Sequence, residues 1–290
     1  MVHFKGKDQI EIGYYPFTEA NYGDTPGAIT LFRIGYMTEV APLYDPELTR
    51  QWVLTDEATH APITLQRKKE NVRLRLTWLQ GELGDYFQED ILNDHHNFFM
   101  ELKIDRGADD YFIVWTGIKA DVLRVRASIG EMVTWIADCI GKSMDTSGDT
   151  INIYGARPGA PFEWDDTYIE MCDDDATYVA LTGLTDWEFI INNQLRPNFL
   201  FNEAGSKQLT TLEEMEQLVT CNMTITFEDN TFLEYLLDQD ELYLKAWVGG
   251  GKWLKAMKGK FALVDPILKP EDLIACRCKF EGRWLVHNFT

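Results

Sequence analysis

The sequence predicts a mainly β protein with short α-helices, arranged as two tandem β-sandwich or barrel-like domains with one short flanking helix each. Three observations support this fold class: segments in which apolar and polar residues alternate, two short segments with helical spacing, and an order of segments that occurs twice. The chain has 290 residues, of which 45% are hydrophobic. That length and composition are sufficient for two packed domains and argue against disorder.

The expected strands are segments in which apolar side chains occupy every second position. In residues 72–78, apolar side chains alternate with Arg73, Arg75 and Thr77, and residues 221–227 show the same alternation. This period places apolar side chains on one face of a strand and polar ones on the other. One face of each sheet is therefore expected to be polar, as in antiparallel sheets with a solvated or partner-facing side. The expected strands are 29–40, 72–79, 111–129 and 131–142 in the first half, and 184–195, 218–227, 241–248, 252–265 and 273–285 in the second.

Two short helices are expected, at residues 84–92 and 229–237. Asp85 and Asp229 stand near their starts, where a carboxylate can cap the first turn. Helices of about two and a half turns are too short to be stable alone, so the apolar stripe of each must cover a sheet. The apolar residues on these stripes are Phe87, Ile91 and Leu92 in the first helix, and Phe232, Leu233, Leu236 and Leu237 in the second.

These segments follow one another in the same order in both halves, at an offset of roughly 145–150 residues, which is typical of an internal duplication. In each half a strand leads into a long polar stretch, at residues 42–71 and 196–217, before the next strand and the helix. Residues 143–164 are rich in Gly, Pro, Ser and Asp, as linkers are. We therefore expect a first β-rich domain at residues 1–145, a linker at 146–164 and a second β-rich domain at 165–290.

The chain is acidic, with 27 Lys and Arg against 47 Asp and Glu and a formal net charge of -20. Tight binding of nucleic acid is disfavoured, because affinity for phosphates comes mainly from Lys and Arg. Plain solubility explains the charge, and so does a surface past which DNA slides. No segment approaches the ~20 apolar residues that span a membrane, and the start lacks an apolar stretch suited to a signal peptide. Five cysteines without disulfide-like spacing fit synthesis in a cytoplasm.

No active site, metal site or cofactor site is expected from the sequence. His95 and His96 are adjacent, and Cys276 and Cys278 share one face of an expected strand, so neither pair has the further ligands that zinc needs. Residues 249–252 lack the spacing of a phosphate-binding loop and are typical of a hairpin turn. We therefore predict that the chain is not an enzyme and has no catalytic residues, metal or cofactor.

A group of lysines interrupts the acidic background in the hairpin at residues 241–265. One interpretation is protection of an exposed sheet edge, because Lys discourages edge-to-edge pairing. The other is a basic patch that meets an acidic patch on the next subunit. The sequence leaves both open. The residues are Lys245, Lys252, Lys255, Lys258 and Lys260.

The second half also carries a series of motifs. A strand ends in Ile191–Asn193, a long loop covers Leu195–Gln217, a strand with alternating Thr covers Thr220–Phe227, and a D-x-x-F-L-x-x-L-L helix follows at Asp229–Leu237. This series resembles the tail tube protein family of long-tailed phages. The amino-terminal E-x-x-Y-G-x-x-P arrangement, which begins at Glu19, resembles the opening of tube proteins. In the first half, the sequence APLYDPELTRQW replaces the INN-like turn.

The resemblance implies a structural virion protein that assembles with itself. Duplicated tube proteins resemble two fused subunits, so three chains would form a pseudo-hexameric ring around an inner β-barrel. The rings stack through long loops into a tail tube, surround the tape measure protein during assembly in the host cytoplasm, and later conduct DNA without binding it specifically. An acidic lumen would help DNA to slide. The residues implied in the inter-ring loop are Leu195, Arg196, Pro197, Asn198, Phe199, Glu203 and Lys207.

Two other functions stay open at this point. A baseplate hub or distal tail protein also combines two tube-like domains, although hubs usually carry insertions. A carbohydrate-binding β-sandwich is the alternative of another class, because the chain has nine Trp. Sugar-binding platforms need exposed aromatic side chains, and Trp78 and Trp115 alternate with polar or small residues in a way that favours burial.

Overall fold

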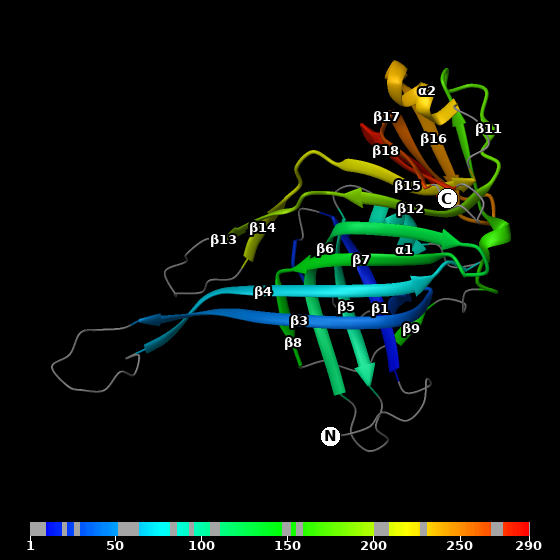
Figure 1. Cartoon of the computed structure of the whole chain (residues 1–290). Coiled ribbons are helices and arrows are strands. Elements are labelled where there is room, and N and C mark those ends of the chain that lie inside the picture. Colours follow the sequence, from blue (N-terminus) through cyan, green and yellow to red (C-terminus); the bar gives the residue numbers. More distant parts are fainter. Residues whose placement is uncertain are drawn as a thin grey trace.

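The structure is a computed structural model, and strands dominate it (Figure 1). The predicted mainly β fold is therefore confirmed. No helix among the described residues is long and apolar enough to cross a membrane. The residues that the structure describes are 10–18, 22–25, 30–51, 64–81, 86–92, 96–104, 111–146, 152–154, 159–199, 209–226, 231–267 and 275–289.

One large antiparallel sheet runs through both halves of the chain. Its eight strands pair in the order β3, β4, β7, β6, β12, β15, β18, β17. Side chains alternate along them between the core and an exposed face, as the burial of every second residue in β7 and β15 shows. The strands are β3 (Tyr36–Gln51), β4 (Thr64–Leu79), β6 (Tyr111–Ser128), β7 (Thr134–Gly141), β12 (Leu184–Asn192), β15 (Leu218–Thr226), β17 (Trp253–Ile267) and β18 (Ala275–Gly282).

Two smaller sheets pack against the large one, and the long strands β6 and β17 each belong to both layers. In the first half, β9, β2, β1, β5, β6 and β8 pair in that order. In the second half the order is β11, β10, β16, β17, β19. The strands not yet given are β1 (Ile10–Thr18), β2 (Thr30–Arg33), β5 (His96–Ile104), β8 (Ser143–Asp145), β9 (Asn152–Tyr154), β10 (Tyr168–Cys172), β11 (Val179–Ala180), β16 (Leu242–Trp247) and β19 (Trp284–Asn288).

The same network of strand pairs occurs in both halves. The pairs β1–β2, β1–β5, β5–β6, β6–β8, β6–β7, β4–β7 and β3–β4 correspond to β10–β11, β10–β16, β16–β17, β17–β19, β17–β18, β15–β18 and β12–β15. Irregularities recur as well. The register shift at Met37/Glu39 returns 147 residues later at Leu184/Asp186, and the shift at Ala120/Val122 returns 141 residues later at Phe261/Leu263. We call residues 10–145 repeat 1 and 168–288 repeat 2. The recurrence supports the expected duplication, and the domain boundaries stay a prediction.

The helices lie where the sequence placed them, but they pack differently. In α1 (Tyr86–Leu92), Phe87 and Ile91 are buried, and the Phe87 ring meets Trp78 with ring centroids 5.1 Å apart. In α2 (Thr231–Asp238), Phe232 and Tyr235 pack on Phe261, and no residue is fully buried. Leu233 and Leu236 of α2 are half-buried, whereas Leu237 is 71% exposed, so its expected place on the covering stripe was wrong. Asp85 and Asp229, the expected caps, lie outside the described residues.

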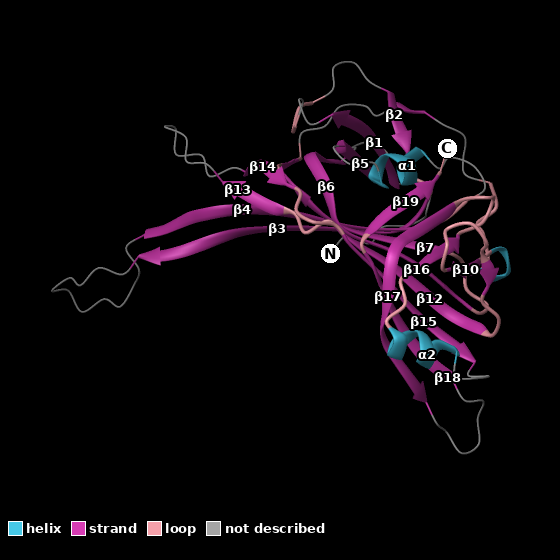
Figure 2. Ribbon diagram, turned by 90° about the horizontal axis from the view of Figure 1, so that it is seen from above, coloured by secondary structure: helices cyan, strands magenta, loops and turns pink. Residues whose placement is uncertain are grey.

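The two long stretches expected as polar loops contain strands, so that expectation was wrong. Residues 42–51 and 64–71 extend β3 and β4 into a hairpin that projects from the body (Figure 2), which we call the arm. Residues 196–217 contain β13 (Arg196–Phe199) and β14 (Leu209–Glu213). Pro42 and Pro46 lie in β3, and a sheet edge tolerates proline because one side of its backbone needs no donors.

Three smaller expectations compare with the structure as follows. The single strand expected at 29–40 is divided by a turn at Ile34–Gly35 into β2 and β3. The expected linker at 146–164, whose bounds stay a prediction, contains β9, which pairs in parallel with β2, and its last residue begins a short 3-10 helix, Trp164–Asp166. The strand expected at 131–142 is present as β7. The segment expected at 273–285 as one strand contains all of β18 and the first two residues of β19, which begins after a break at Arg283.

Candidate assembly interface

The two repeats are joined by strand pairing between β6 and β12. Residues Val122 to Ser128 of β6 lie antiparallel to Asn192 to Asp186 of β12, with Arg126 opposite Glu188. The Ile129 amide donates to the Thr185 carbonyl just beyond the paired segment. The joint therefore continues the large sheet from one repeat into the next without an edge.

The turn that follows β12 forms hydrogen bonds with the bulge in β6, at the end of the paired segment. The Asn193 amide donates to the Asp121 carbonyl over 2.8 Å, and the Leu195 amide donates to Asp121 Oδ1 over 2.9 Å. The Asn193 side chain donates to the Ala120 carbonyl over 3.0 Å and accepts from Gln217 over 2.9 Å. Gln194 adopts the left-handed conformation with a φ of 47°. The INN-like motif thus contacts repeat 1 within the same chain.

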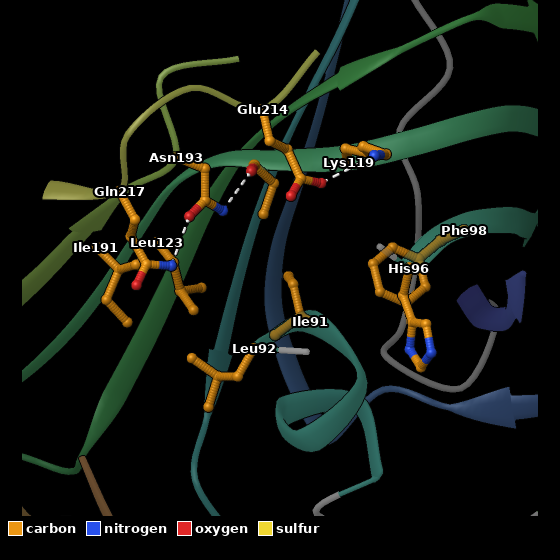
Figure 3. Close-up of a pocket in the computed structure, with 11 residues that line it drawn as sticks. Ile91, Leu92, His96, Phe98, Lys119, Leu123, Ile191, Asn193, Glu214 and Gln217 are labelled. Atoms are coloured by element: carbon orange, nitrogen blue, oxygen red, sulfur yellow. Dashed lines mark hydrogen bonds and ion pairs between the residues drawn. The ribbon is translucent and has the colours of Figure 1, made fainter. Parts of the chain in front are cut away.

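A buried ion pair crosses the same joint. The Lys119 side chain on β6 is only 2% exposed, and its ammonium lies 2.8 Å from Glu214 Oε1, just after β14. Glu214 is more exposed, at 27%. The pair borders a cavity that is also lined by α1 and by β12 (Figure 3). A buried ammonium is stable only when an opposite charge or hydrogen-bond acceptors compensate its lost hydration. Glu214 supplies such a charge, and the ion pair holds the segment between β14 and β15 against repeat 1.

An apolar cluster completes the contact. Leu195, Leu209 and Leu212, around the β13–β14 hairpin, are each less than a tenth exposed. They pack with Phe199 of the hairpin and with Tyr22 and Ile140 of repeat 1. The β13–β14 hairpin is therefore seated on repeat 1.

Two strand edges remain without a described neighbour, and they correspond to the two edges that meet in the joint. By the 147-residue offset, β3 from Ala41 to Asp45 is equivalent to β12 at the joint. By the 141-residue offset, β17 from Leu263 to Ile267 is equivalent to the paired end of β6. Among the described strands, β4 alone pairs with β3, and β18 alone pairs with this end of β17.

The exposure of residues at these edges differs from that of their equivalents in the joint. Phe189 on β12 is fully buried, whereas its equivalent on β3, Pro42, is exposed. Val125 on β6 is also fully buried, whereas its equivalent on β17, Pro266, is half-buried. Leu263 at the β17 edge is 49% exposed. Residues at a strand edge are expected to be more exposed than their equivalents in the joint when no neighbouring strand covers them.

The exposed face of the large sheet carries charges of both signs, which the acidic composition did not indicate. Arg75 and Arg124 both donate to Asp138, over 2.6 Å and 2.7 Å. Partial burial raises the pKa of Asp138, but the hydrogen bonds from both guanidinium groups outweigh it, so the pKa is lowered. The basic residues on this face are Arg73, Arg75, Arg124, Arg126, Lys260, Arg277 and Lys279, and the acidic ones are Glu39, Asp138, Asp186, Glu188, Asp265 and Glu281.

The five hairpin lysines do not form one patch. Lys245 and Lys255 lie on the outer face of the small sheet, where they reach Glu170 and Asp175 at 4.0 Å and 3.0 Å. Lys252 donates to the Phe289 carbonyl, Lys258 is exposed with a φ of 47°, and Lys260 lies on the large sheet opposite Glu281. The interpretation of a subunit-binding patch stays a prediction for each lysine separately.

The residues expected in the inter-ring loop have different surroundings. Leu195 is buried and Phe199 is half-buried in the cluster on repeat 1. Arg196 and Pro197 are exposed and Asn198 is half-buried. Glu203 and Lys207 lie outside the described residues. The base of this loop therefore contacts its own chain, and a contact of the rest with another ring stays a prediction.

The joint contains three residues that the sequence did not indicate: Lys119, Asp121 and Glu214. Lys119 is part of an apolar strand segment, and its partner is 95 residues away, so a local pattern gives no sign of the pair. The one available signal was a lysine at a position where alternation requires burial.

The histidines, cysteines and tryptophans concern the alternatives of a metal site and a sugar-binding site. Among the described residues no group of His, Cys, Asp and Glu could hold a metal ion. Cys276 and Cys278 both face the core, and burial raises the pKa of the Cys278 thiol. Trp78 and Trp115 are fully buried, as expected. Trp247 lies on the outer face of the small sheet, where the Lys245 ammonium is 4.0 Å from the centre of its ring, and this contact competes with sugar stacking.

Comparison with known proteins gave limited similarity. No family model and no curated protein matches the chain. A chain from the tail of an empty gene transfer agent particle, with C6 symmetry, is 10% identical with a TM-score of 0.36, and the match covers 43% of this chain and 96% of that chain. A chain from the virion of a native gene transfer agent particle is 10% identical with a TM-score of 0.34 and the same coverage.

Proposed function

We propose that this chain is a structural protein of a phage tail, whose two repeats are adjoining segments of a ring in the tail tube. The observation that carries the proposal is the β6–β12 joint. It shows how one repeat pairs with the next, and it leaves the chain with the same two edges at its opposite ends.

The edges predict how copies of the chain would join. The β17 edge of one chain is equivalent to β6, and the β3 edge of the next is equivalent to β12, so the two can pair antiparallel as β6 and β12 do. Such a contact uses different surfaces on the two partners, and contacts of this kind close into rings when the rotation per subunit allows it. Closure removes the exposed edges, which otherwise favour aggregation.

The equivalences also give a register for this contact. Arg126 opposite Glu188 and Val125 opposite Phe189 in the joint translate into Ile267 opposite Ala41 and Pro266 opposite Pro42 between chains. Both prolines lack an amide donor. Because the two prolines fall opposite each other, the hydrogen bonds that they cannot donate are lost from one residue pair, and the neighbouring pairs keep theirs. This coincidence supports the register.

The number of chains and the role of the ring rest on the resemblance to duplicated tube proteins. Three chains would supply six repeats, with the exposed face of the large sheet lining a channel for DNA and, during assembly, for the tape measure protein. Some cations on that face are already matched by acids, such as Arg75 and Arg124 with Asp138 and Lys279 with Glu281. A wall whose cations have acidic partners binds phosphates weakly, which suits passage of DNA.

Cross-linking tests the edge contact directly. Cysteines at both Ala41 and Ile267 should form disulfides between chains under mild oxidation, giving covalent species of up to three chains. The matched control combines Ala41→Cys with Leu263→Cys, because four residues along a strand correspond to ~13 Å and exceed the reach of a disulfide. Stacked tubes in negative-stain images support a tube protein, whereas rings that do not stack favour a baseplate hub. A protein that stays monomeric at high concentration and forms neither cross-link refutes the proposal.

A further inference from the structure

The two helices occupy equivalent places in the repeats, but only one of them is covered. Two apolar residues end the stripe of each helix, at an offset of 145 residues: Ile91 and Leu92 in α1, and Leu236 and Leu237 in α2. Ile91 and Leu92 are 6% and 7% exposed. Leu236 is half-buried, and Leu237 is 71% exposed. The end of the helix is therefore buried in repeat 1 and open to solvent in repeat 2.

Repeat 2 covers the end of α1 at the joint. Ile91 and Leu92 line a cavity together with Leu123 of β6 and with Ile191 and Asn193 of repeat 2. Figure 3 shows the end of α1, with Leu92, facing the strands that carry Leu123 and Ile191. Ile191 is itself 1% exposed. The burial of this helix end thus belongs to the contact between the two repeats.

The corresponding place in repeat 2 has only its own side of that contact. α2 lies beside β17 (Figures 1 and 2), where Phe232 and Tyr235 pack on the ring of Phe261. Phe261 is the equivalent of Ala120 on β6, and it directly precedes the part of β17 whose edge is open. Among the described strands, β18 alone pairs with that part. Repeat 2 therefore presents α2 next to an open edge, at the place where β12 covers α1 in the joint.

We propose that the end of α2 is a second contact between copies of the chain, in which repeat 1 of the next chain covers Leu237 where its β3 edge pairs with β17. This inference rests on the proposed ring. If β3 stands at β17 as β12 stands at β6, the same pairing brings β3 beside α2. An exposed leucine gains most from a neighbour that removes it from water. The contact would add apolar area to a strand pairing in which Pro42 and Pro266 donate no hydrogen bonds.

Thiol labelling tests whether Leu237 becomes covered. The five native cysteines are all buried, and buried thiols are inert. In Leu237→Cys a water-soluble maleimide should therefore react with the introduced thiol. The labelling rate at position 237 should fall at least about tenfold when rings form, because a covered thiol reacts only when the contact opens. Val179→Cys, at a residue of β11 that is 65% exposed, is the matched control and should label equally fast before and after assembly.

A charge at the same position gives a second measure. Leu237→Asp should raise the protein concentration needed for assembly about tenfold, because the contact would have to bury a carboxylate without a partner. Val179→Asp makes the same kind of change at an exposed residue outside the contact, so we expect little effect. Both variants should keep the denaturation midpoint of the monomer, because both positions are exposed in the single chain.

The edge cross-link separates this inference from the proposed ring, so L237D is also made with cysteines at 41 and 267. The α2 contact is refuted and the ring stands if the cross-link forms while L237D assembles at the concentration of the parent. The same holds if the thiol introduced at 237 labels as fast in rings as in monomers. Protection that appears only in stacked tubes also refutes the contact, because α2 would then face the next ring. If cysteines at 41 and 267 give no cross-link in the otherwise unchanged chain, the ring fails and this contact fails with it.

Discussion

Removing the charge of Glu214 should destabilise the protein more than removing that of Lys119. The Lys119 side chain is 2% exposed and its ammonium lies 2.8 Å from the Glu214 carboxylate, which is 27% exposed. Removing one partner of a fully buried pair costs about 3–5 kcal/mol, because the other charge is left uncompensated. Glu214 is partly hydrated and water can reach this side of the pair, so we expect about 2 kcal/mol for Glu214→Gln.

The complementary change should cost less. In Lys119→Met the apolar stem stays in place, and the carboxylate that remains can turn towards water because it is already partly exposed. We expect a loss of about 1 kcal/mol or less. In the double variant the buried ammonium is removed together with the carboxylate, so its stability should equal that of K119M and exceed that of E214Q.

Denaturation by guanidinium chloride measures these differences, with all variants compared at one low concentration at which light scattering shows monomers. Glu216→Gln, at an exposed position two residues along the chain, is the matched control and should change little. The reasoning fails if E214Q unfolds within about 0.5 kcal/mol of the parent. It also fails if the double variant is less stable than both single ones, because the ammonium would then not be the source of the loss.

Two further outcomes follow from the packing and the charges. Phe261→Ala should cost about 3–5 kcal/mol, since Phe232, Tyr235 and Phe280 all pack on that ring; Leu237→Ala in α2, at a residue 71% exposed, should shift the midpoint of chemical denaturation very little. Asp138→Asn should cost at most about 1 kcal/mol at pH 7, because the pair is partly exposed. The lowered pKa of Asp138 means that this stabilisation is present above the ordinary carboxyl pKa and is lost as the pH falls through the lowered value. Thermal melts of the two proteins should therefore converge as the pH falls below the ordinary carboxyl pKa, and a constant gap would contradict the assignment.

Strands with one polar face could be predicted from the sequence, and strands buried on both faces could not. The segment 72–79 shows clear alternation because Arg73 and Arg75 point to the exposed face. In β5, Phe98 and Met100 face the main core while Phe99 faces a second cluster with Leu31. Apolar residues therefore occupy both faces of β5, and the period of two that reveals a strand is lost.

The duplication was visible in the order of elements, but the joint it creates was not. Asp121 occupies a strand bulge, and the residues that bind it come from a turn more than 70 positions away. Such contacts depend on which edges meet in space, and a local pattern does not report that. The arm was missed for a different reason: Pro42 and Pro46 disfavour a central strand, and only the sheet order shows that β3 lies at an edge.

The prolines at the two edges also bear on how a chain with open strands would avoid pairing wrongly. An edge without prolines can pair with any strand in many registers. With Pro42 on β3 and Pro266 on β17, a shift along the partner strand would place the two missing donors opposite two different residues and disrupt two pairs instead of one. The joint inside the chain has Val125 and Phe189 at the equivalent positions, where covalent connection already favours the correct register. Prolines thus occur at the proposed contact between chains, where register would have to be selected, and they are absent from the equivalent pair within the chain.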